Sequence, residues 1–357
     1  MKRVALLGAT GSIGRQAVEV VSTRPDLELC ALQSGATPLD GLAHRHGVEH
    51  VQVGGDAVEL LERCEPDVVL NAIVGFAGVR ATLWALESGV TLALANKESL
   101  VAAGELAIRA RSTGDGLLIP VDSEHSALQQ CLEGRDPATV AGLVLTASGG
   151  PFRGRSRGEL ADATPEDALA HPTWSMGPKI TVDSATLANK GLELIEAHWL
   201  FGLPYDAIEV VVHPTSVVHA LVRLRDGALL AHAGLPDMRV PISYALTYPA
   251  RAATPVPQLD LVGLELSFEA PDDDAFPLLG LARAAGKRGG TAPCAYNAAN
   301  EVAVEAFLDG RIGFLDIASV VEETLGRVEG TPARDLADLV DADAEARRLA
   351  VTELQPA

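Results

Sequence analysis

The sequence predicts an α/β protein in three parts: a doubly wound parallel sheet over residues 1–121, a central α+β domain over 122–270 and a small helical domain over 271–357. Two observations predict the first part. Short apolar, β-branched segments alternate with helical stretches, and a glycine-rich turn follows the first of these segments. A third observation marks the end of the first part: from Asp122 onward, glycines and prolines interrupt the chain more often.

The parallel sheet is predicted from five apolar segments. These expected strands are Val4–Leu7, Leu27–Leu32, Val68–Ile73, Leu92–Ala95 and Leu117–Val121. Between the first two, Arg15–Thr23 is compatible with a helix, and Pro25 would stop it soon afterwards. Strands that alternate with helices in this way are typical of a Rossmann-like nucleotide-binding domain.

The central and last parts have different patterns. We expect a long helix over Ser184–Phe201, followed by an antiparallel sheet. The expected strands of that sheet are Ile208–His213, Ser216–Leu224 and Ala228–Ala231. The proline-rich Pro249–Pro257 and the acidic Pro271–Asp274 are interpreted as a linker. After about Ala275 the chain is rich in Ala, Leu and Glu, which predicts helices.

Composition excludes several classes of function. Hydrophobic residues make up 48% of the 357 residues and charged residues 21%, which is ordinary for a folded globular protein. Lys and Arg total 28 against 48 Asp and Glu, so the net charge of −20 argues against a nucleic-acid partner. The first apolar segment stops at Gly8, too short for a signal peptide or a membrane span, so we expect no membrane association.

The four cysteines are scattered and form no C-x-x-C pair, which argues against a structural zinc site and against disulfides. A reducing cytoplasm fits this pattern.

The turn Gly8–Gly14 (GATGSIG) lies between a predicted strand and a predicted helix. Its glycines would allow a pyrophosphate to approach the helix N-terminus, although such a turn can also be purely structural. The second strand ends at Ser34 without the carboxylate that NAD-specific sites commonly carry, so NADP is the better prediction. No Arg or Lys stands there either, and the nearest basic residues, His44–His46, are a helix away.

Two carboxylates follow the strand that ends at Val121. At a period of two residues, Asp122 and Glu124 would project to one side at the carboxyl end of this strand, where open α/β sheets bind ligands. Their oxygens suit Mg²⁺ or Mn²⁺. The alternative interpretation is a solvated acidic turn.

The expected helix that Asp183 and Ser184 open would place Asn189, Lys190 and Glu193 on one face. This face can present an amide, an ammonium and a carboxylate together, and the hydroxyl-rich helix start could hold a phosphate. The alternative is an ordinary solvent-exposed stripe with a local Lys–Glu pair. Dense apolar residues around these positions weigh against that alternative.

Two loops could complete such a site. Ser148-Gly149-Gly150 offers a hydroxyl and backbone donors for a phosphate, but alone it is only a turn. The segment His171–Lys179, called the lid segment below, has two prolines, a glycine and Trp174, a composition suited to a mobile lid. Trp174 could equally be a packing anchor and His171 a surface residue. His213–His219 is interpreted as structural.

Together these motifs resemble the 1-deoxy-D-xylulose 5-phosphate reductoisomerase family from end to end. The motifs that carry the resemblance, in chain order, are Gly8–Gly14 (GATGSIG), Ala95–Ser99 (ANKES), Val121–His125 (VDSEH), Ser148–Phe152 (SGGPF), His171–Gly177 (HPTWSMG), Asp183–Glu193 (DSATLANKGLE), His213–His219 and Asn297–Glu301 (NAANE).

The resemblance implies a role for each matching residue. Cofactor-binding residues would be Thr10, Gly11, Ser12, Ile13, Asn96, Glu98, Met176 and Gly177. Metal ligands would be Asp122, Glu124 and Glu193. The substrate would contact Lys97, Ser123, Glu124, Ser148, His171, Trp174, Ser184, Asn189, Lys190 and Glu193, with Ser148, Ser184, Asn189 and Lys190 at its phosphate. Catalytic roles would fall to Lys97, Glu124 and His171.

The implied activity is a metal-dependent rearrangement and NADPH reduction of a sugar phosphate, in non-mevalonate isoprenoid precursor biosynthesis. Mg²⁺ or Mn²⁺ would serve, with Co²⁺ as a further candidate, and the enzyme would be a homodimer whose contact involves the strands around Val211–Leu224. Some relatives carry a basic residue where this chain has Ala36 or Thr37. Two alternatives stay open: a related reductase that acts on another sugar phosphate or a semialdehyde, and a non-catalytic nucleotide sensor.

Overall fold

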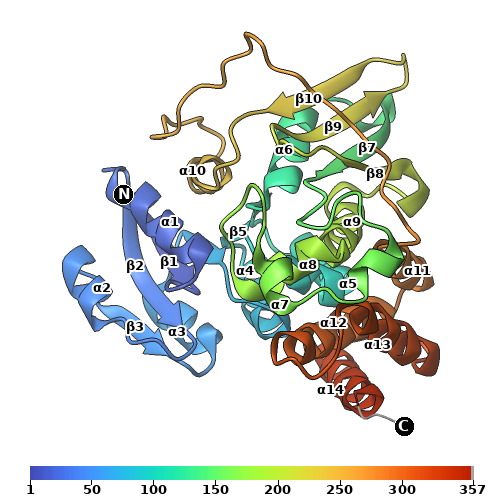
Figure 1. The fold of residues 1–357 in the computed structure, drawn as a ribbon. Coiled ribbons are helices and arrows are strands. Elements are labelled where there is room, and N and C mark those ends of the chain that lie inside the picture. The colour runs from blue at the N-terminus through green and yellow to red at the C-terminus, as the bar shows by residue number, and fades with distance from the viewer. Residues whose placement is uncertain (355–357) are drawn as a thin grey trace. The chain divides into compact units, whose positions relative to one another are not determined.

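The computed structural model describes residues 1–354 (Figure 1). These residues fall into two compact units. The first unit contains Met1–Leu100, Glu105–Ser126 and Asp237–Pro257. The second contains Val101–Gly104, Ala127–Pro236 and the chain from Gln258 onward. The division into three domains at residues 121 and 270 stays a prediction.

The first unit is built on a six-stranded parallel sheet with the strand order β3-β2-β1-β4-β5-β6. Its strands are β1 (Lys2–Leu7), β2 (Leu27–Ser34), β3 (His50–Val53), β4 (Val68–Asn71), β5 (Thr91–Leu94) and β6 (Leu118–Pro120). The five predicted strands and the doubly wound fold are confirmed. The sequence did not predict β3, one of the two edge strands, whose residues alternate between apolar and polar and are not fully buried.

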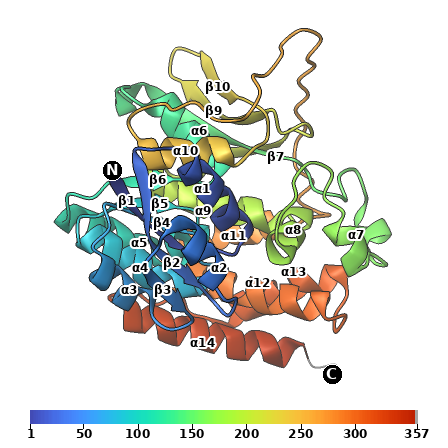
Figure 2. The ribbon, with the colours of Figure 1, turned by 90° about the vertical axis from the view of Figure 1, so that its left-hand side faces the viewer.

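Apart from α10, the helices of the first unit lie between these strands in the sequence, and α1 confirms the helix expected over Arg15–Thr23. The helices are α1 (Ser12–Ser22), α2 (Asp40–His46), α3 (Ala57–Cys64), the 3₁₀ helix η1 (Phe76–Gly78), α4 (Val79–Glu87), α5 (Lys97–Thr113) and α10 (Arg239–Thr247). Although α10 is far from α1 in the sequence, the two helices pack together (Figure 2). Ile242 and Leu246 of α10 belong to the same buried core as Val20 of α1. The expected linker Pro249–Pro257 is therefore part of this unit.

The second unit contains a four-stranded sheet with the order β10-β9-β7-β8. Its strands are β7 (Val140–Ala147), β8 (Ile208–Val212), β9 (Val218–Leu224) and β10 (Leu229–Ala233). β9 pairs antiparallel with β10, as expected, and also with β7, a strand that was not predicted, whereas β7 and β8 are parallel. The prediction of a purely antiparallel sheet is therefore wrong, because a helical crossover of about sixty residues returns the chain to the same edge.

The expected long helix near Ser184–Phe201 is confirmed from Ala188 to Phe201, but its start is wrong, because a separate helix ends at Ala185. α8 (Pro178–Ala185) ends before Leu187, which has a left-handed φ of 61°, and α9 (Ala188–Phe201) follows. Leu187 is buried in the core of the unit, and this packing offsets the unfavourable backbone conformation. The remaining helices between α5 and β8 are α6 (Ser123–Leu132), α7 (Pro165–Leu169) and the 3₁₀ helices η2 (Pro137–Thr139), η3 (Arg157–Leu160) and η4 (Tyr205–Ala207).

The C-terminal part of the second unit is helical, as predicted. It consists of α11 (Leu278–Arg288), α12 (Ala292–Leu308), α13 (Phe314–Arg327) and α14 (Leu336–Glu353). α12 packs against the other three and is buried along most of its length, including the polar side chains of Asn297 and Asn300. Within residues 1–354, no helix combines the length and the apolar character that crossing a membrane requires.

Candidate active site

The glycine turn of the first unit has the geometry of a tight strand-to-helix connection. Gly8 follows β1 with a φ of 78°, and a Cβ placed on it would lie 2.4 Å from the carbonyl oxygen of Ala72. A Cβ on Gly14 would lie 2.3 Å from the carbonyl oxygen of Gly8. Because both positions exclude a side chain, Thr10, Gly11, Ser12 and Ile13 form a compact entry to α1.

Asn96 and Glu98 lie where β5 passes into α5, at the carboxyl edge of the same sheet. Asn96 is buried, accepts a hydrogen bond from the backbone N–H of Ser99 at 3.1 Å and donates to the carbonyl of Gly75 at 3.0 Å. Its Nδ2 atom also donates to Glu98 at 3.1 Å. These bonds fix the start of α5 beside the loop after β4, the strand between β1 and β5.

Asp122 and Glu124 lie where β6 passes into α6. The carbonyl of Asp122 accepts a hydrogen bond from the N–H of Ser126 at 2.8 Å, so Asp122 immediately precedes the helix and Glu124 is in its first turn. The expectation that both project from one side of a strand is therefore wrong, because the chain turns into a helix at Ser123. Their location after the carboxyl end of a parallel strand is confirmed.

Lys97 forms an ion pair with Asp122. Burial by itself raises the pKa of Asp122, but the Lys97 ammonium, together with the nearby His125, outweighs it and holds the pKa well below its ordinary value. Ser123 donates a hydrogen bond to Glu124 at 2.5 Å. This edge of the first unit therefore presents an ionised carboxylate, a buried ammonium and a hydrogen-bonded Ser–Glu pair.

In the second unit, Ser148 follows β7 and contacts His171 of the lid segment. The Nδ1 atom of His171 accepts hydrogen bonds from the backbone N–H groups of Thr173 at 3.1 Å and Trp174 at 2.9 Å. The proton is therefore on Nε2, which donates to the hydroxyl of Ser148 at 2.9 Å. Burial lowers the pKa of His171, which favours this neutral form.

The Ser148 turn lies directly against α8. Gly150 has a φ of 65°, and a Cβ on it would lie 2.9 Å from the carbonyl oxygen of Ser184. Only a residue without a side chain allows this approach. The structure therefore brings Ser148, His171 and Ser184, which the sequence separates by up to 36 positions, into one neighbourhood.

Asn189, Lys190 and Glu193 form a connected group on α9. Asn189 donates to one carboxylate oxygen of Glu193 at 2.5 Å, and Lys190 forms an ion pair with the other. Lys190 is 3% exposed and Glu193 is 1% exposed, so the interpretation as a solvent-exposed stripe is wrong. Two charged groups buried to this degree are uncommon outside binding and catalytic sites, although structural ion pairs also occur.

The lid segment has no regular secondary structure from His171 to Gly177, and α8 begins at Pro178. Trp174 and Met176 are partly exposed, so neither is a fully buried packing anchor.

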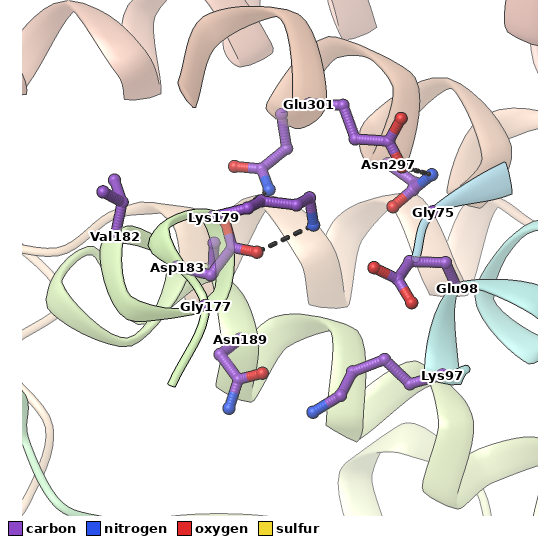
Figure 3. Close-up of polar contacts among 12 residues, drawn as sticks. Gly75, Lys97, Glu98, Gly177, Lys179, Val182, Asp183, Asn189, Asn297 and Glu301 are labelled. Carbon is purple, nitrogen blue, oxygen red and sulfur yellow. Dashed lines mark hydrogen bonds and ion pairs between the residues drawn. The ribbon is translucent and has the colours of Figure 1, made fainter. Parts of the chain in front are cut away.

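A polar cluster around Asp183 in the second unit was not predicted from the sequence. This residue was expected to open a helix, but it lies near the C-terminal end of α8 and is buried (Figure 3). It bonds to Lys179 and to Asn300 of α12. The signal that could have revealed it is the pair of amides in the otherwise apolar run Ala295–Ala303, since buried amides require partners.

Comparison with family models covers most of the chain. Residues 4–53 and 40–104 match 1-deoxy-D-xylulose 5-phosphate reductoisomerase, residues 118–201 match its C-terminal domain, and residues 233–349 match the DXP reductoisomerase C-terminal domain.

Relatives with the name 1-deoxy-D-xylulose 5-phosphate reductoisomerase align over nearly the whole chain. The protein of Leifsonia xyli subsp. xyli is 51% identical, with 98% of each chain covered. The protein of Xanthomonas campestris pv. campestris is 49% identical, with 98% of this chain and 96% of the relative covered. Among solved structures, the Zymomonas mobilis enzyme in complex with NADPH is 42% identical, covers 100% of both chains and has a TM-score of 0.91. A DOX-P reductoisomerase in complex with NADPH, fosmidomycin and magnesium is 38% identical, covers 99% of this chain and 98% of its own, and has a TM-score of 0.92.

Proposed function

The chain belongs to the 1-deoxy-D-xylulose 5-phosphate reductoisomerase family, and we propose that it rearranges and reduces 1-deoxy-D-xylulose 5-phosphate to 2-C-methyl-D-erythritol 4-phosphate. The observation that carries this proposal is the neighbourhood of Ser148, His171 and Ser184. Ser148 and His171 are hydrogen-bonded to each other, and the same turn approaches the backbone of Ser184, so this neighbourhood contains two hydroxyl side chains and an imidazole, groups that can donate hydrogen bonds to a phosphate monoester.

NADPH fits the first unit. The tight turn at Gly8 and the close packing at Gly14 leave the backbone N–H groups at the start of α1 accessible to a pyrophosphate, and Thr10 to Ile13 would hold it. Asn96 and Glu98 are fixed on a neighbouring strand of the same sheet edge. β2 ends at Ser34 without a carboxylate that would repel the 2′-phosphate of NADP.

The carboxylates fit a divalent metal ion. Asp122, Glu124 and Glu193 offer only hard oxygen donors, which suit Mg²⁺ or Mn²⁺, with Co²⁺ as a further candidate. Lys97 keeps Asp122 ionised, and an ionised carboxylate is what a cation requires as ligand. The chemistry that such an ion supplies is Lewis-acid polarisation of the sugar carbonyl.

The protein's own residues would hold the sugar at both ends. Ser148, Ser184, Asn189 and Lys190 would bind the phosphate together with His171, and the resemblance assigns Lys97 and Ser123 to the sugar hydroxyls. The buried Lys190 ammonium brings positive charge to the phosphate in a chain whose net charge is −20. Fixing both ends keeps the fragments of a retro-aldol cleavage aligned for recombination.

The lid segment would close over the bound sugar. Trp174 would cover the substrate, while Met176 and Gly177 would lie toward the nicotinamide. Closure would exclude water from the carbon–carbon bond that breaks and from the hydride transfer that follows. His171 accepts hydrogen bonds from two backbone N–H groups of the lid segment and donates to Ser148. It therefore couples the position of the lid segment to the proposed phosphate-binding residues, called the phosphate grip below: Ser148, Ser184, Asn189, Lys190 and His171.

The direct test follows the absorbance of reduced nicotinamide when 1-deoxy-D-xylulose 5-phosphate is added with NADPH, with and without Mg²⁺ or Mn²⁺. We expect metal-dependent oxidation of NADPH, and a comparison with NADH gives the cofactor preference. A folded protein that does not oxidise NADPH under these conditions would contradict the proposal.

Two other functions predict different results. A reductase that acts on another sugar phosphate or a semialdehyde needs no group of three carboxylates, so its rate would not depend on metal. A nucleotide sensor would bind NADPH but would tolerate Lys190→Ala without functional loss. The buried Lys190–Glu193 pair favours the reductoisomerase, because a sensor has no use for a buried ammonium outside its nucleotide site.

We also propose a homodimer that forms through the four-stranded sheet of the second unit. β9 and β8 carry Val218, Leu221 and Val211, which gather with Val144 of β7 in an apolar cluster separate from the main core. Light scattering at micromolar concentration should give twice the mass of the chain, and a monomer would contradict this proposal.

A cytoplasmic location is the last part of the proposal. It is supported by four cysteines that form no disulfide in the structure. Thiol titration of the purified, denatured protein under non-reducing conditions should count four thiols per chain.

A further inference from the structure

The buried carboxylate of Asp183 joins two distant parts of the second unit. One of its oxygens accepts a hydrogen bond from Nδ2 of Asn300 on α12 at 2.7 Å. The other lies 2.8 Å from the Lys179 ammonium, the contact drawn in Figure 3. Asp183 is 1% exposed, whereas the side chain of Lys179 is 21% exposed. Both carboxylate oxygens of Asp183 therefore have a partner: the amide of Asn300 on α12 and the ammonium of Lys179 on α8.

This contact lies where a small displacement of α8 would also move residues that are proposed to bind the substrate phosphate. α8 is only eight residues long, begins inside the lid segment and carries Ser184 immediately after Asp183. The Ser148 turn packs on the carbonyl of Ser184 through Gly150. A rotation of α8 would therefore move three things together: the hydroxyl of Ser184, the carbonyl of Ser184 that contacts the Ser148 turn, and the end of the lid segment.

We propose that the Asp183–Asn300 hydrogen bond, charge-balanced by Lys179, positions Ser184 and the end of the lid segment for binding of the substrate phosphate. Asp183, Asn300 and Lys179 are thus positioning residues that do not touch the substrate themselves. The inference rests on the proposed function, in which Ser184 binds that phosphate.

Because this cluster contains one negative and one positive charge, the proposal predicts that a second substitution can compensate for the first. In Lys179→Met the buried carboxylate of Asp183 keeps only one hydrogen-bond donor, the amide of Asn300. A buried charge without an ionic partner is unfavourable, so we expect the carboxylate to turn toward solvent and to move α8 with it. Adding Asp183→Asn removes the buried charge, and the new amide can still accept the hydrogen bond from Asn300. The second substitution should therefore repair the damage of the first.

The experiment measures KM for 1-deoxy-D-xylulose 5-phosphate, KM for NADPH, kcat and the melting temperature of each variant. Lys179→Met and Asn300→Ala should each raise KM for the sugar phosphate by about tenfold or more, as expected when a binding group is displaced. KM for NADPH should rise less than KM for the sugar phosphate, because the glycine turn that would hold its pyrophosphate is on the first unit, and of the proposed cofactor residues only Met176 and Gly177 belong to the displaced segment. The double variant Lys179→Met, Asp183→Asn should return KM for the sugar phosphate to within about threefold of wild type.

The matched control is Lys287→Met, which breaks an ion pair with Asp206 whose two side chains are 47% and 78% exposed. It should leave every kinetic constant unchanged. A purely structural role predicts that Lys179→Met lowers the melting temperature while KM for the sugar phosphate stays constant, and this result would overturn the proposal. So would a double variant that binds the sugar phosphate no better than Lys179→Met alone.

Two further outcomes are covered by additional measurements. If Lys179→Met does not fold, Asn300→Ala carries the same test, because it removes the hydrogen bond without leaving an unbalanced charge. If the wild-type protein does not turn over the sugar phosphate, the proposed function fails, and the change in melting temperature with added inorganic phosphate replaces KM. A phosphate-induced shift equal in wild type and Asn300→Ala would then overturn the inference.

Discussion

His171 donates a hydrogen bond from Nε2 to the hydroxyl of Ser148 at 2.9 Å, and its Nδ1 atom accepts from two backbone N–H groups of the lid segment. One neutral imidazole thus ties the lid segment to the turn after β7. Protonation of Nδ1 would end its role as an acceptor, so this arrangement holds only while the ring is neutral.

This relationship predicts a pH dependence. Burial lowers the pKa of His171 below its ordinary value of 6.5, so the folded protein resists protonation more than the unfolded chain. The stability from this group is therefore complete above pH 6.5 and is lost as the pH falls through the folded-state pKa. KM for the sugar phosphate should rise over the same range as the lid segment loosens.

The control variant is His171→Gln, whose amide can still donate to Ser148 but does not titrate. Chemical denaturation of both proteins from about pH 7.5 down to about pH 5 measures the effect, because this range begins above an ordinary histidine pKa and extends below it, where a lowered pKa lies. A difference in free energy of unfolding that stays constant across this range would contradict the assignment of the neutral ring.

Gly150→Ala should separate the Ser148 turn from α8. The added Cβ would lie 2.9 Å from the carbonyl of Ser184 and would also stand on a backbone with positive φ. We expect a loss of about 2 kcal/mol in free energy of unfolding and a rise in KM for the sugar phosphate. Gly154→Ala is the matched control, because its φ of 80° is equally unfavourable while no atom lies within 4 Å of the new Cβ. Equal KM values in the two variants would contradict the proposed phosphate grip.

Glu193→Gln should impair metal binding and turnover, because it replaces an anionic oxygen with a neutral amide of the same size. We expect kcat to fall about 100-fold or more, in line with the several kcal/mol that Lewis-acid stabilisation supplies. Titration with Mn²⁺, followed by electron paramagnetic resonance, measures the affinity directly. Glu209→Gln on β8, whose side chain is 50% exposed in its pair with Arg223, should behave as wild type. Unchanged metal affinity in Glu193→Gln would remove Glu193 from the ligand set.

Gly8→Ala should weaken NADPH binding. Its Cβ would lie 2.4 Å from the carbonyl of Ala72, so the turn before α1 must shift. We expect the dissociation constant for NADPH to rise about tenfold or more, equivalent to 1.4 kcal/mol. Gly47→Ala, also at positive φ but with open space around the Cβ, tests whether backbone strain alone produces the effect. Fluorescence titration with NADPH compares the two, and equal affinities would contradict a cofactor site at this turn.

Much of the first unit could be predicted because its strands are buried on both faces. A strand such as Leu27–Ser34 then appears as a nearly continuous apolar run, and the glycine turn between β1 and α1 marks where the sheet binds ligand. β3 escaped prediction because His50–Val53 is an edge strand with a short, half-exposed and mixed sequence.

The site was harder to predict where tertiary packing decides the backbone. Nothing in the helix-compatible sequence around Leu187 indicates a left-handed residue, which is stabilised by burial of its side chain in the core. The sequence around Asp122 and Glu124 is likewise compatible with the end of a strand, so the start of α6 at Ser123 could not be predicted from it. Residue identities nevertheless sufficed to select the candidate set, because the same carboxylates and hydroxyls are available in either conformation.

The most direct test of the central claim uses substrate labelled with ¹³C at both C3 and C4 and follows the product by ¹³C NMR. Reductoisomerisation breaks the bond between these two carbons and joins C4 to C2, so the one-bond coupling between the labels should disappear in the product. A reductase that does not rearrange the skeleton would keep C3 and C4 adjacent. Product that forms at the expense of NADPH and still shows this coupling would contradict the account.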